Sequence, residues 1–259
     1  MKYIDTHAHY DDSKFEEDLN MVLEEVKKNK VVAIINDSVD VNNSKEVVEL
    51  VSKRENMFAA IGIHPTEDPG ANYIEELRGL YLENKEKIVA IGEIGLDYYW
   101  EKDNRESQHK KFLDQIELAN ELELPIVIHC RDAGDDIVKL MKKCMPKYGC
   151  VFHCYQPNDE TKRFIIQNDF YISLTGNITF KRNEYFHKVI KEIPIDRIMV
   201  ETDSPYMSPE PFRGKRNSSV NIPIIAKKLA EIKEIEEENL AEIVYNNSIR
   251  FYHLEGKIK

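Results

Sequence analysis

The amino-acid sequence predicts an α/β protein built as a single (β/α)8 barrel of the TIM type. Eight short apolar segments rich in β-branched residues recur along the 259 residues, and longer stretches with helical spacing of apolar residues separate them. Successive segments begin mostly about 20 to 35 residues apart, which is the usual size of a βα unit with its helical crossover. Eight such units are the number that closes a barrel.

The expected strands can be placed one by one along the chain. They are residues 2–6, 31–36, 58–63, 88–94, 125–129, 150–154, 170–174 and 197–201. Nearly all-apolar runs such as IVIH and VAIIN are typical of strands buried on both faces. Helical spacing is clear from Phe15 to Val26 and from Phe112 to Leu122. Residues 222–254 hold two more helical patterns, so we expect an eighth helix and a C-terminal extension at about residues 236–259 within one domain, 1–259.

An open doubly wound sheet would show the same alternation of strands and helices. That fold usually places a Gly-rich phosphate loop after the first strand. Here the first strand leads into Thr6-His7-Ala8-His9, and neither G-x-G-x-x-G nor G-x-x-x-x-G-K-[ST] occurs. Dinucleotide and P-loop functions therefore lose their main support.

Composition narrows the class of protein. A hydrophobic fraction of 42% and a charged fraction of 32% are typical of a globular chain and exclude a disordered one. No apolar run approaches the roughly 18 residues of a membrane span, and the first residues lack the apolar stretch of a signal peptide. We therefore expect a cytoplasmic protein without membrane association. Four cysteines without a C-x-x-C pair predict reduced thiols.

The net charge of −11, from 36 basic and 47 acidic residues, at first argues against a nucleic-acid partner, because non-specific affinity for phosphates comes from Lys and Arg. Much of the acidity, however, falls in helical patterns such as residues 16–25 and 234–238. The charge therefore predicts solubility and weak non-specific DNA binding rather than the character of the site.

Histidines and carboxylates stand at or just after the ends of five predicted strands. They are Asp5, His7, His9, Glu93, His129, His153, Glu201 and Asp203. In a barrel the C-terminal strand ends line one mouth, so residues far apart in sequence converge there. Successive strand residues point to opposite faces, which puts Asp5, His7 and His9 on one side and Glu201 and Asp203 on one side. The pattern predicts a metal site at the C-terminal mouth.

The number of candidate ligands favours two metal ions. Imidazole and carboxylate together suit Zn, Mn, Fe or Ni, while Mg prefers oxygen ligands, so the identity of the metal stays open. Four histidines and two carboxylates exceed one tetrahedral set. Glu93 is the natural bridge, with His7, His9 and Asp203 completing one site and His129 and His153 the other. Two such metals can clamp both the attacking and the leaving oxygen.

Other histidines and cysteines fit structural roles better. A lone histidine at a strand end is more often structural than a ligand, but a joint set at five strand ends is hard to produce by core packing. His109, His187 and His253 fall in helical patterns. Cys130 and Cys154 each follow a proposed ligand, so strand parity turns them away from the centre, and we expect them to act as small buried hydrophobes.

Six segments resemble the TatD family of metal-dependent nucleases, within the amidohydrolase-like superfamily, and together span nearly the whole chain. They are Ile4-Asp5-Thr6-His7-Ala8-His9, Gly62-Ile63-His64-Pro65, Gly92-Glu93-Ile94-Gly95-Leu96-Asp97-Tyr98, Ile128-His129-Cys130-Arg131, Phe152-His153-Cys154 and Glu201-Thr202-Asp203-Ser204-Pro205-Tyr206. The resemblance implies hydrolysis of phosphodiester bonds in DNA, often from the 3′ end. It implies one metal held by His7, His9, Glu93 and Asp203, and the other by Glu93, His129 and His153. His64 and Glu201 match family positions, with supporting or substrate-contact roles.

Two loops depart from the family pattern. After strand six the family usually continues with an aromatic, a small hydroxyl residue and glycine, where this chain has Tyr155-Gln156-Pro157-Asn158. After strand eight, Ser218-Ser219 replace the usual acidic residue and proline. Every proposed metal ligand is present, so these departures bear on substrate preference rather than on metal binding.

A mechanism follows from the ligand set. Two divalent ions and two carboxylates leave the mouth with a charge of about +2, so it is electropositive inside an acidic protein. Water activated by the metals would attack phosphorus, with Asp203 as the candidate for proton transfer and Glu93 as the bridge. Arg213, Lys215 and Arg216 follow strand eight and are expected to contact phosphate. Tyr98, Tyr99 and Trp100 either stack on bases or pack the rim.

DNA is thus the expected substrate, with no protein partner predicted. An alternative keeps the enzyme and changes the bond to an ester, lactone or amide, because related barrels share the mouth chemistry. The chain has no candidate metal-bridging lysine, and its basic loop suits phosphate, which favours the nuclease. A metal-binding module without turnover is disfavoured because all six ligands are intact.

Overall fold

The computed structural model of the protein describes residues 1–181 and 183–259. The strands are β1 (Tyr3–Ala8), β2 (Val31–Asp37), β3 (Met57–Ile61), β4 (Ile88–Asp97), β5 (Ile126–Arg131), β6 (Cys150–Phe152), β7 (Tyr171–Leu174) and β8 (Ile198–Val200). The α-helices are α1 (Leu19–Lys28), α2 (Val41–Ser52), α3 (Tyr73–Glu83), α4 (Arg105–Leu122), α5 (Gly134–Met141), α6 (Asp159–Gln167), α7 (Glu184–Glu192), α8 (Ile222–Lys233) and α9 (Glu237–Tyr252). Short 3-10 helices lie at η1 (Ser13–Phe15), η2 (Gly176–Thr179), η3 (Ile195–Arg197) and η4 (Ser219–Asn221).

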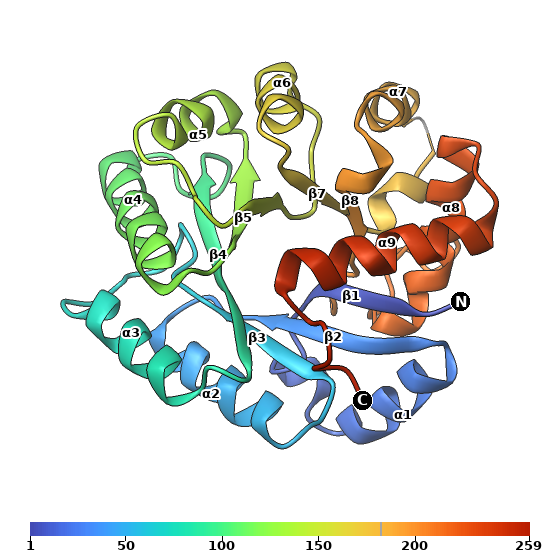
Figure 1. The fold of residues 1–259 in the computed structure, drawn as a ribbon, viewed down its shortest axis with the longest axis horizontal. Helices are drawn as coiled ribbons and strands as arrows, with labels where there is room; N and C mark the ends of the chain where they lie inside the picture. The colour runs from blue at the N-terminus through green and yellow to red at the C-terminus, as the bar shows by residue number, and fades with distance from the viewer. Residues whose placement is uncertain (182) are drawn as a thin grey trace. The chain divides into compact units, whose positions relative to one another are not determined.

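The strands form an eight-stranded sheet whose order is their order along the chain, β1 to β8. Pairing is parallel where β1 meets β2, where β3, β4, β5 and β6 follow one another, and where β7 meets β8. Strands in sequence order with intervening helices are the topology of a (β/α)8 fold, and Figure 1 shows this alternation. The predicted fold class is confirmed.

The chain divides into two compact units. The terminal unit comprises Met1–Asn36, Glu55–Met57 and Ile172–Lys259, and the central unit comprises Asp37–Arg54 and Phe58–Tyr171. The terminal unit thus holds β1, β8 and nearly all of β2 and β7, and the central unit holds β4 to β6 and nearly all of β3. The extent of one domain over residues 1–259 stays a prediction.

In the terminal unit, β1 is buried along its whole length, and the C-terminal helix α9 packs on it and on β8 (Figure 1). The apolar stripe of α9 includes Leu240, Val244 and Phe251, all buried. Each such side chain contributes about 1.5 to 3 kcal/mol on burial. The Tyr252 hydroxyl donates a 3.1 Å hydrogen bond to the carbonyl of Thr6. The predicted C-terminal extension is therefore a helix that supports the first strand.

In the central unit, β4 is buried at all ten positions and lies beside β5, with Gly95 opposite His129. Gly95 has φ of 147°, and a Cβ there would stand 1.9 Å from the carbonyl oxygen of His129. Only glycine meets both demands. This close approach lets β4 run on past Glu93, to Asp97, beside the strand that carries His129.

Most strand boundaries differ from the sequence-based expectations by one or two residues, and three differences bear on the site or on the first helix. β4 ends at Asp97 rather than at residue 94, and β6 ends at Phe152, so His153 lies just beyond the strand. The helical pattern from Phe15 to Val26 breaks into η1 and α1. The reason is local: the Asp12 carboxylate accepts a 2.8 Å hydrogen bond from the backbone N–H of Lys14, which favours a short turn over a continuous helix.

Across the described parts of the chain, the search for a helix both long enough and apolar enough to cross a membrane finds none.

Candidate metal centre

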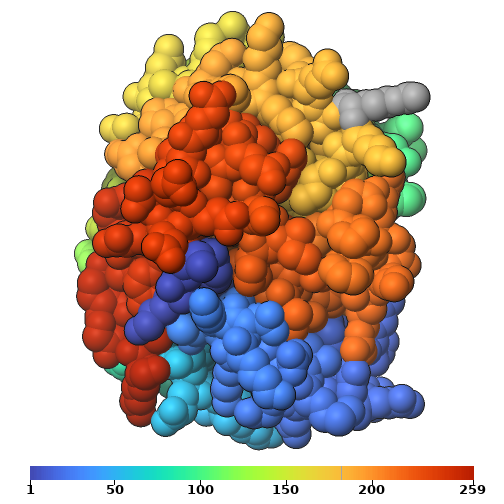
Figure 2. Space-filling view, turned by 90° about the vertical axis from the view of Figure 1, so that its right-hand side faces the viewer, coloured from blue at the N-terminus to red at the C-terminus, as the bar shows by residue number. Residues whose placement is uncertain are grey.

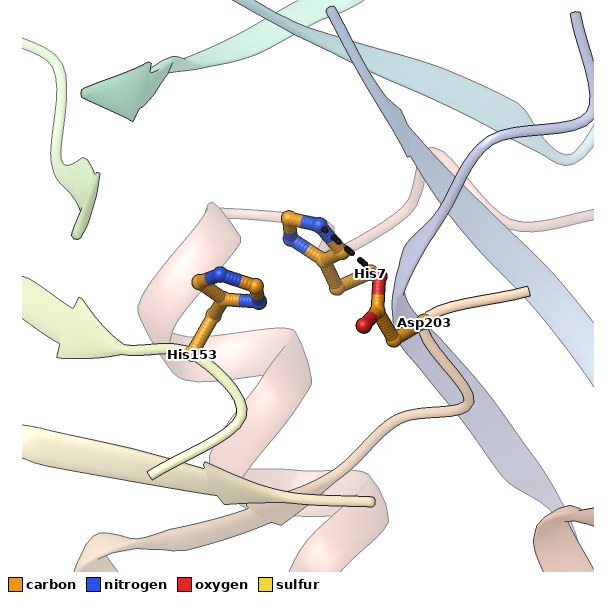
Figure 3. A group of neighbouring side chains, drawn as sticks. All are labelled: His7, His153 and Asp203. Atoms are coloured by element: carbon orange, nitrogen blue, oxygen red, sulfur yellow. Dashed lines mark ion pairs between the residues drawn. The ribbon is translucent and has the colours of Figure 1, made fainter. Parts of the chain in front are cut away.

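In the terminal unit, the end of β1 and the turn after β8 bring together His7, His9 and Asp203, which we call the β1/β8 cluster. The Nε2 atoms of His7 and His9 are 3.1 Å apart. The Asp203 Oδ1 atom is 3.6 Å from His9 Nε2 and 3.9 Å from His7 Nε2, and Figure 3 marks the latter ion pair. Ligands about 2.1 Å from one divalent ion lie about 3.0 to 3.4 Å from each other. The separation of His7 and His9 falls in this range and the two Asp203 distances lie a little above it, so the three donors are close enough together to share one such ion.

Backbone hydrogen bonds hold this cluster in register. The N–H of Asp203 donates to the carbonyl of His7 at 2.9 Å, and the N–H of His9 donates to the carbonyl of Ser204 at 2.7 Å. An isolated parallel bridge links Ala8 to Ser204. Because main-chain bonds set the spacing, the imidazoles and the carboxylate face each other without depending on flexible loops.

Asp5 supports the cluster from behind. Its carboxylate accepts hydrogen bonds from the N–H and hydroxyl of Thr202, at 2.9 and 2.5 Å, and from the hydroxyl of Ser219 at 2.6 Å. Burial raises the pKa of Asp5 to about 7, against the lowering effect of these hydrogen bonds. Strand parity placed Asp5 with His7 and His9. The structure gives its carboxylate a different task, which is to tie β1 to the segment after β8, and Ser219 is part of that tie.

Glu201 is also buried, and its carboxylate accepts a hydrogen bond from the Ser173 hydroxyl on β7. This contact suits the supporting role expected from the sequence, although it does not test that role.

In the central unit, the ends of β3 to β6 bring His64, His129 and His153 around Glu93, and we call these residues the Glu93 cluster. The Oε1 atom of Glu93 is 2.7 Å from His129 Nδ1, 2.7 Å from His153 Nε2 and 3.7 Å from His64 Nε2. His153 Nε2 lies 3.4 Å from His129 Nδ1. Ligand atoms of His64, Glu93 and His129 lie within 4.8 Å of one another, as a metal site requires. Glu93 is the point on which the three imidazoles converge.

Asp97 orients His129, and sequence reasoning missed this role. Its carboxylate lies 3.0 Å from His129 Nε2 and also accepts 2.8 Å hydrogen bonds from the N–H groups of Tyr99 and Trp100. A proton on Nε2 leaves Nδ1 as the nitrogen that faces Glu93, the arrangement by which carboxylates orient metal-binding histidines. The available signal was the spacing: Asp97 follows Glu93 by four residues in one strand, so both share a face.

Charges within the Glu93 cluster are mutually dependent. Burial lowers the pKa of His129, but hydrogen bonds with Asp97 and Glu93 outweigh it and raise the pKa. Burial raises the pKa of Asp97, but its hydrogen bonds with His129, Trp100 and Tyr99 lower it overall. Burial and the neighbouring His129 lower the pKa of His64 to about 3, so His64 is neutral at physiological pH. Its Nδ1 atom lies 2.7 Å from the Thr66 hydroxyl, which fixes the ring.

One face of α4 holds the ends of β3 and β4 in place. Gln108, Lys111 and Gln115 are buried and lie at helical spacing on the same side. Gln108 exchanges hydrogen bonds with both backbone groups of Asp97, at 2.9 and 3.0 Å, and Gln115 does the same with Ile63, at 2.7 and 3.1 Å. The Lys111 ammonium donates to the carbonyl of Pro65 at 2.8 Å. These three polar side chains interrupt an apolar helical face, which was the signal in the sequence.

Replacing Gln115 by Leu is expected to destabilise the protein by about 1 to 3 kcal/mol, because both backbone groups of Ile63 lose their buried partner. The measurement is the midpoint of denaturant-induced unfolding. Glu117→Leu, on the exposed face of the same helix, is the matched control. Equal midpoints for the two variants would show that the hydrogen bonds between Gln115 and Ile63 do not stabilise the protein.

Replacing Asp97 by Ala is expected to weaken metal binding by about 10 to 100-fold, since such orienting carboxylates typically contribute that much. Asp97→Asn retains an acceptor for His129 and should recover part of the affinity. Exposed Asp103 supplies the control, Asp103→Ala. Metal affinity is measured by titration calorimetry, and an Asp97→Ala protein with unchanged affinity would contradict the orienting role.

The structure also places the remaining residues singled out in the sequence. Tyr98 is buried, with its hydroxyl 2.7 Å from His109 Nε2 and 2.8 Å from the Asp136 carboxylate, so it packs rather than stacks on a base. Tyr99 and Trp100 are exposed, and the Arg131 guanidinium lies 4.2 Å from the ring centre of Tyr99.

His109, His187 and His253 lie in helices or at a helix end, as expected. His109 lies in α4, His187 lies in α7 with Nε2 2.8 Å from the Ile178 carbonyl, and His253 ends α9.

All four cysteines are free thiols. Cys130 and Cys154 were expected to be buried, but both are only partly buried, and Cys154 lies beyond the end of β6 at Phe152. Burial raises the pKa of Cys130 to about 12, which makes it unreactive.

The loop after β6, in which the sequence departs from the family pattern, leads directly into helix α6. The Asn158 side chain accepts hydrogen bonds from the N–H groups of Glu160 and Thr161, at 3.0 and 2.9 Å, and so caps α6. Asparagine in this loop therefore begins a helix.

The chain is similar in sequence to a known protein family and to two bacterial hydrolases. The family model described as TatD related DNase matches residues 4–253. An uncharacterized metal-dependent hydrolase of Bacillus subtilis, YabD, is 38% identical, with 96% of this chain and 98% of the relative covered. The uncharacterized metal-dependent hydrolase YcfH of Escherichia coli K12 is 32% identical over 99% of this chain and 97% of its own.

Solved structures agree. The crystal structure of YjjV, a TatD homologue from Escherichia coli K12, superposes with a TM-score of 0.92 and 26% identity, covering 97% of this chain and 98% of that one. A TatD family hydrolase from Entamoeba histolytica has a TM-score of 0.86 and 29% identity, covering 97% of this chain and 98% of that chain.

Proposed function

This chain is a metal-dependent hydrolase of the TatD related DNase family, and from that premise we propose that its substrate is DNA, whose phosphodiester bonds it hydrolyses from the 3′ end. The observation that carries the proposal is the pair of histidine and carboxylate clusters at strand ends. Each has donor atoms at the spacings that a divalent ion requires. Packing of an apolar core does not explain why histidine and carboxylate side chains lie at these distances from each other.

We assign the ligands as the sequence predicted them. In this assignment His7, His9 and Asp203 would hold one divalent ion, His129 and His153 would hold a second, and Glu93 would serve both. The assignment rests on the fold class, in which the C-terminal ends of the strands line one mouth, and on the donor geometry within each cluster. Zn, Mg, Mn, Fe and Ni are all candidates, with the nitrogen-rich set favouring the transition metals over Mg.

When bound, the ions supply Lewis-acid chemistry and offset charge on the phosphate oxygens. The residues of the chain do the rest. Asp203 takes the proton of the attacking water, because it is the carboxylate of the β1/β8 cluster. Asp97 holds His129 in one tautomer, and neutral His64 lies against Glu93 without competing for its charge. Asp5 and Glu201 support the strand ends from the core.

A panel of substrates tests the proposal. The full chain, stripped of metal and reloaded with one divalent metal at a time, is offered end-labelled single-stranded DNA, RNA, a simple phosphodiester and a set of lactones and amides. We expect metal-dependent shortening of DNA from its 3′ end. A 3′-blocked oligonucleotide checks the polarity. Lactone, ester or amide turnover with intact DNA would instead support the alternative hydrolase and overturn the nuclease.

A further inference from the structure

The terminal unit contains a basic pocket beside the β1/β8 cluster. It has a volume of about 520 Å³, and its lining includes Lys14, Arg213, Lys215 and Arg216 together with the rings of Phe180 and Tyr206. Pockets of about 300 to 1,000 Å³ accept small ligands. The lining holds four cationic side chains and no carboxylate, in a chain whose net charge is −11. Such a local excess of positive charge indicates that the pocket has a functional role.

Among the residues that the structure describes, one of the four cations is neutralised by a carboxylate. Arg216 donates to both carboxylate oxygens of Asp18, at 2.8 and 2.6 Å, and also to the carbonyl of Lys14. These bonds join the segment after β8 to the N-terminal segment, which lie side by side as orange and blue in Figure 2. Arg216, expected from the sequence to contact phosphate, thus has a structural task that holds Lys14 at the pocket. Within the described residues, Lys14, Arg213 and Lys215 form no ion pair.

Aromatic rings place two of these remaining cations. The Lys14 ammonium lies 4.2 Å from the ring centre of Tyr206, and the Arg213 guanidinium lies 4.3 Å from that of Phe180. A cation over a ring is held by the electrostatic attraction of the π face. The N–H groups of a cation held in this way stay available to an anion. Tyr206 itself is 48% exposed, and its hydroxyl donates to Asp12 at 3.0 Å, which fixes the ring.

The pocket is also connected to the proposed chemistry. The N–H of Tyr206 donates a 2.8 Å hydrogen bond to the carbonyl of Asp203, so one tight turn links the pocket to a proposed metal ligand. A ligand that spans this turn must be long and anionic, with flat apolar groups next to its charges. A single-stranded nucleic acid has this composition, because phosphates alternate with bases along its length.

We propose that the basic pocket binds one nucleotide of a single-stranded nucleic acid, with its phosphate at Lys14, Arg213 and Lys215 and its base against Tyr206. The inference rests on the proposed function and adds residues to it. Lys14 and Tyr206 become substrate contacts, and Arg216 becomes a positioning residue. Phosphate contacts of this kind set the register of the strand and carry no sequence information.

Direct binding tests the pocket separately from hydrolysis. The full metal-loaded chain is titrated against a fluorescent, hydrolysis-resistant phosphorothioate oligodeoxynucleotide, and anisotropy is followed over a salt series. For the double variant Lys14→Ala, Arg213→Ala we expect Kd to rise at least about tenfold, because charge-assisted hydrogen bonds are lost. The slope of log K against log salt should fall by about 0.7 for each lost contact with a single strand.

The control variants are also made in the terminal unit. Lys188 on α7 is exposed and does not line the basic pocket. Lys188→Ala therefore removes one positive charge outside the pocket and should leave Kd and the salt slope unchanged. Lys14→Arg with Arg213→Lys should restore most of the affinity. An unchanged Kd and slope in the alanine double variant would overturn the pocket, even if the enzyme hydrolyses DNA. Binding that depends on the pocket without any DNA hydrolysis would overturn the nuclease and leave the pocket standing, and an RNA arm reports which strand it prefers.

Discussion

The Glu93→Ala variant should lose metal-dependent hydrolysis by more than about a hundredfold, because even residues that only orient metal ligands contribute 10 to 100-fold. Three imidazoles converge on the carboxylate of Glu93, two of them at 2.7 Å. Removing it leaves these nitrogens without their shared anion and, in the proposed ligand set, removes the carboxylate that would bridge the two ions. The bound metal should therefore fall below the content of the unmodified protein.

Metal content by mass spectrometry and turnover of labelled DNA are measured on the same samples. Glu83→Ala, an exposed acidic residue of the same unit, should leave both unchanged. A Glu93→Ala protein that retains full metal content and full turnover would exclude Glu93 as a ligand. Loss of turnover at full metal content would assign it to catalysis alone.

The Asp203→Asn variant should lose turnover by about 10² to 10⁴-fold, the usual contribution of a general base. The amide oxygen retains a ligand atom in nearly the same place, but it cannot accept the proton of the attacking water. Because the backbone of Asp203 is bound to His7, the fold of the turn should persist. The expected signature is a lower kcat with a smaller change in KM.

The comparison with Asp203→Ala separates the two roles of this residue, since alanine removes the ligand atom as well and should lower the metal content further. Exposed Asp196 on the same unit provides the control variant Asp196→Asn. An Asp203→Asn protein with unchanged kcat at full metal content would require another proton acceptor.

The ligand set was accessible from the sequence for a physical reason. Parallel strands end at one edge, so a polar residue such as Glu93 or His129 at the end of an apolar run is marked by its position alone. Within each unit the structure brings some of these residues together, His7 with His9 and Glu93 with His129 and His153, while their role as metal ligands stays a prediction.

The supporting residues could not be assigned in the same way. Gln108, Lys111 and Gln115 interrupt the apolar face of α4, but the backbone groups that they bind become known only when α4 lies against the ends of β3 and β4. Asp97 falls in a recognisable segment, but its partner His129 is 32 residues away. Hydrogen bonds between distant segments depend on distances that no local pattern encodes.

The sequence by itself determined the order of strands and helices, the fold class and the types of residue at the strand ends, because period and apolarity are local properties of the chain. The tertiary structure decided how those residues are used. Arg216 and Asp18 are 198 residues apart and form one ion pair, which turned an expected phosphate contact into a support for Lys14. The net charge of −11 likewise says little about the pocket, because folding brings Lys14 beside Arg213, Lys215 and Arg216, which already lie together in the sequence.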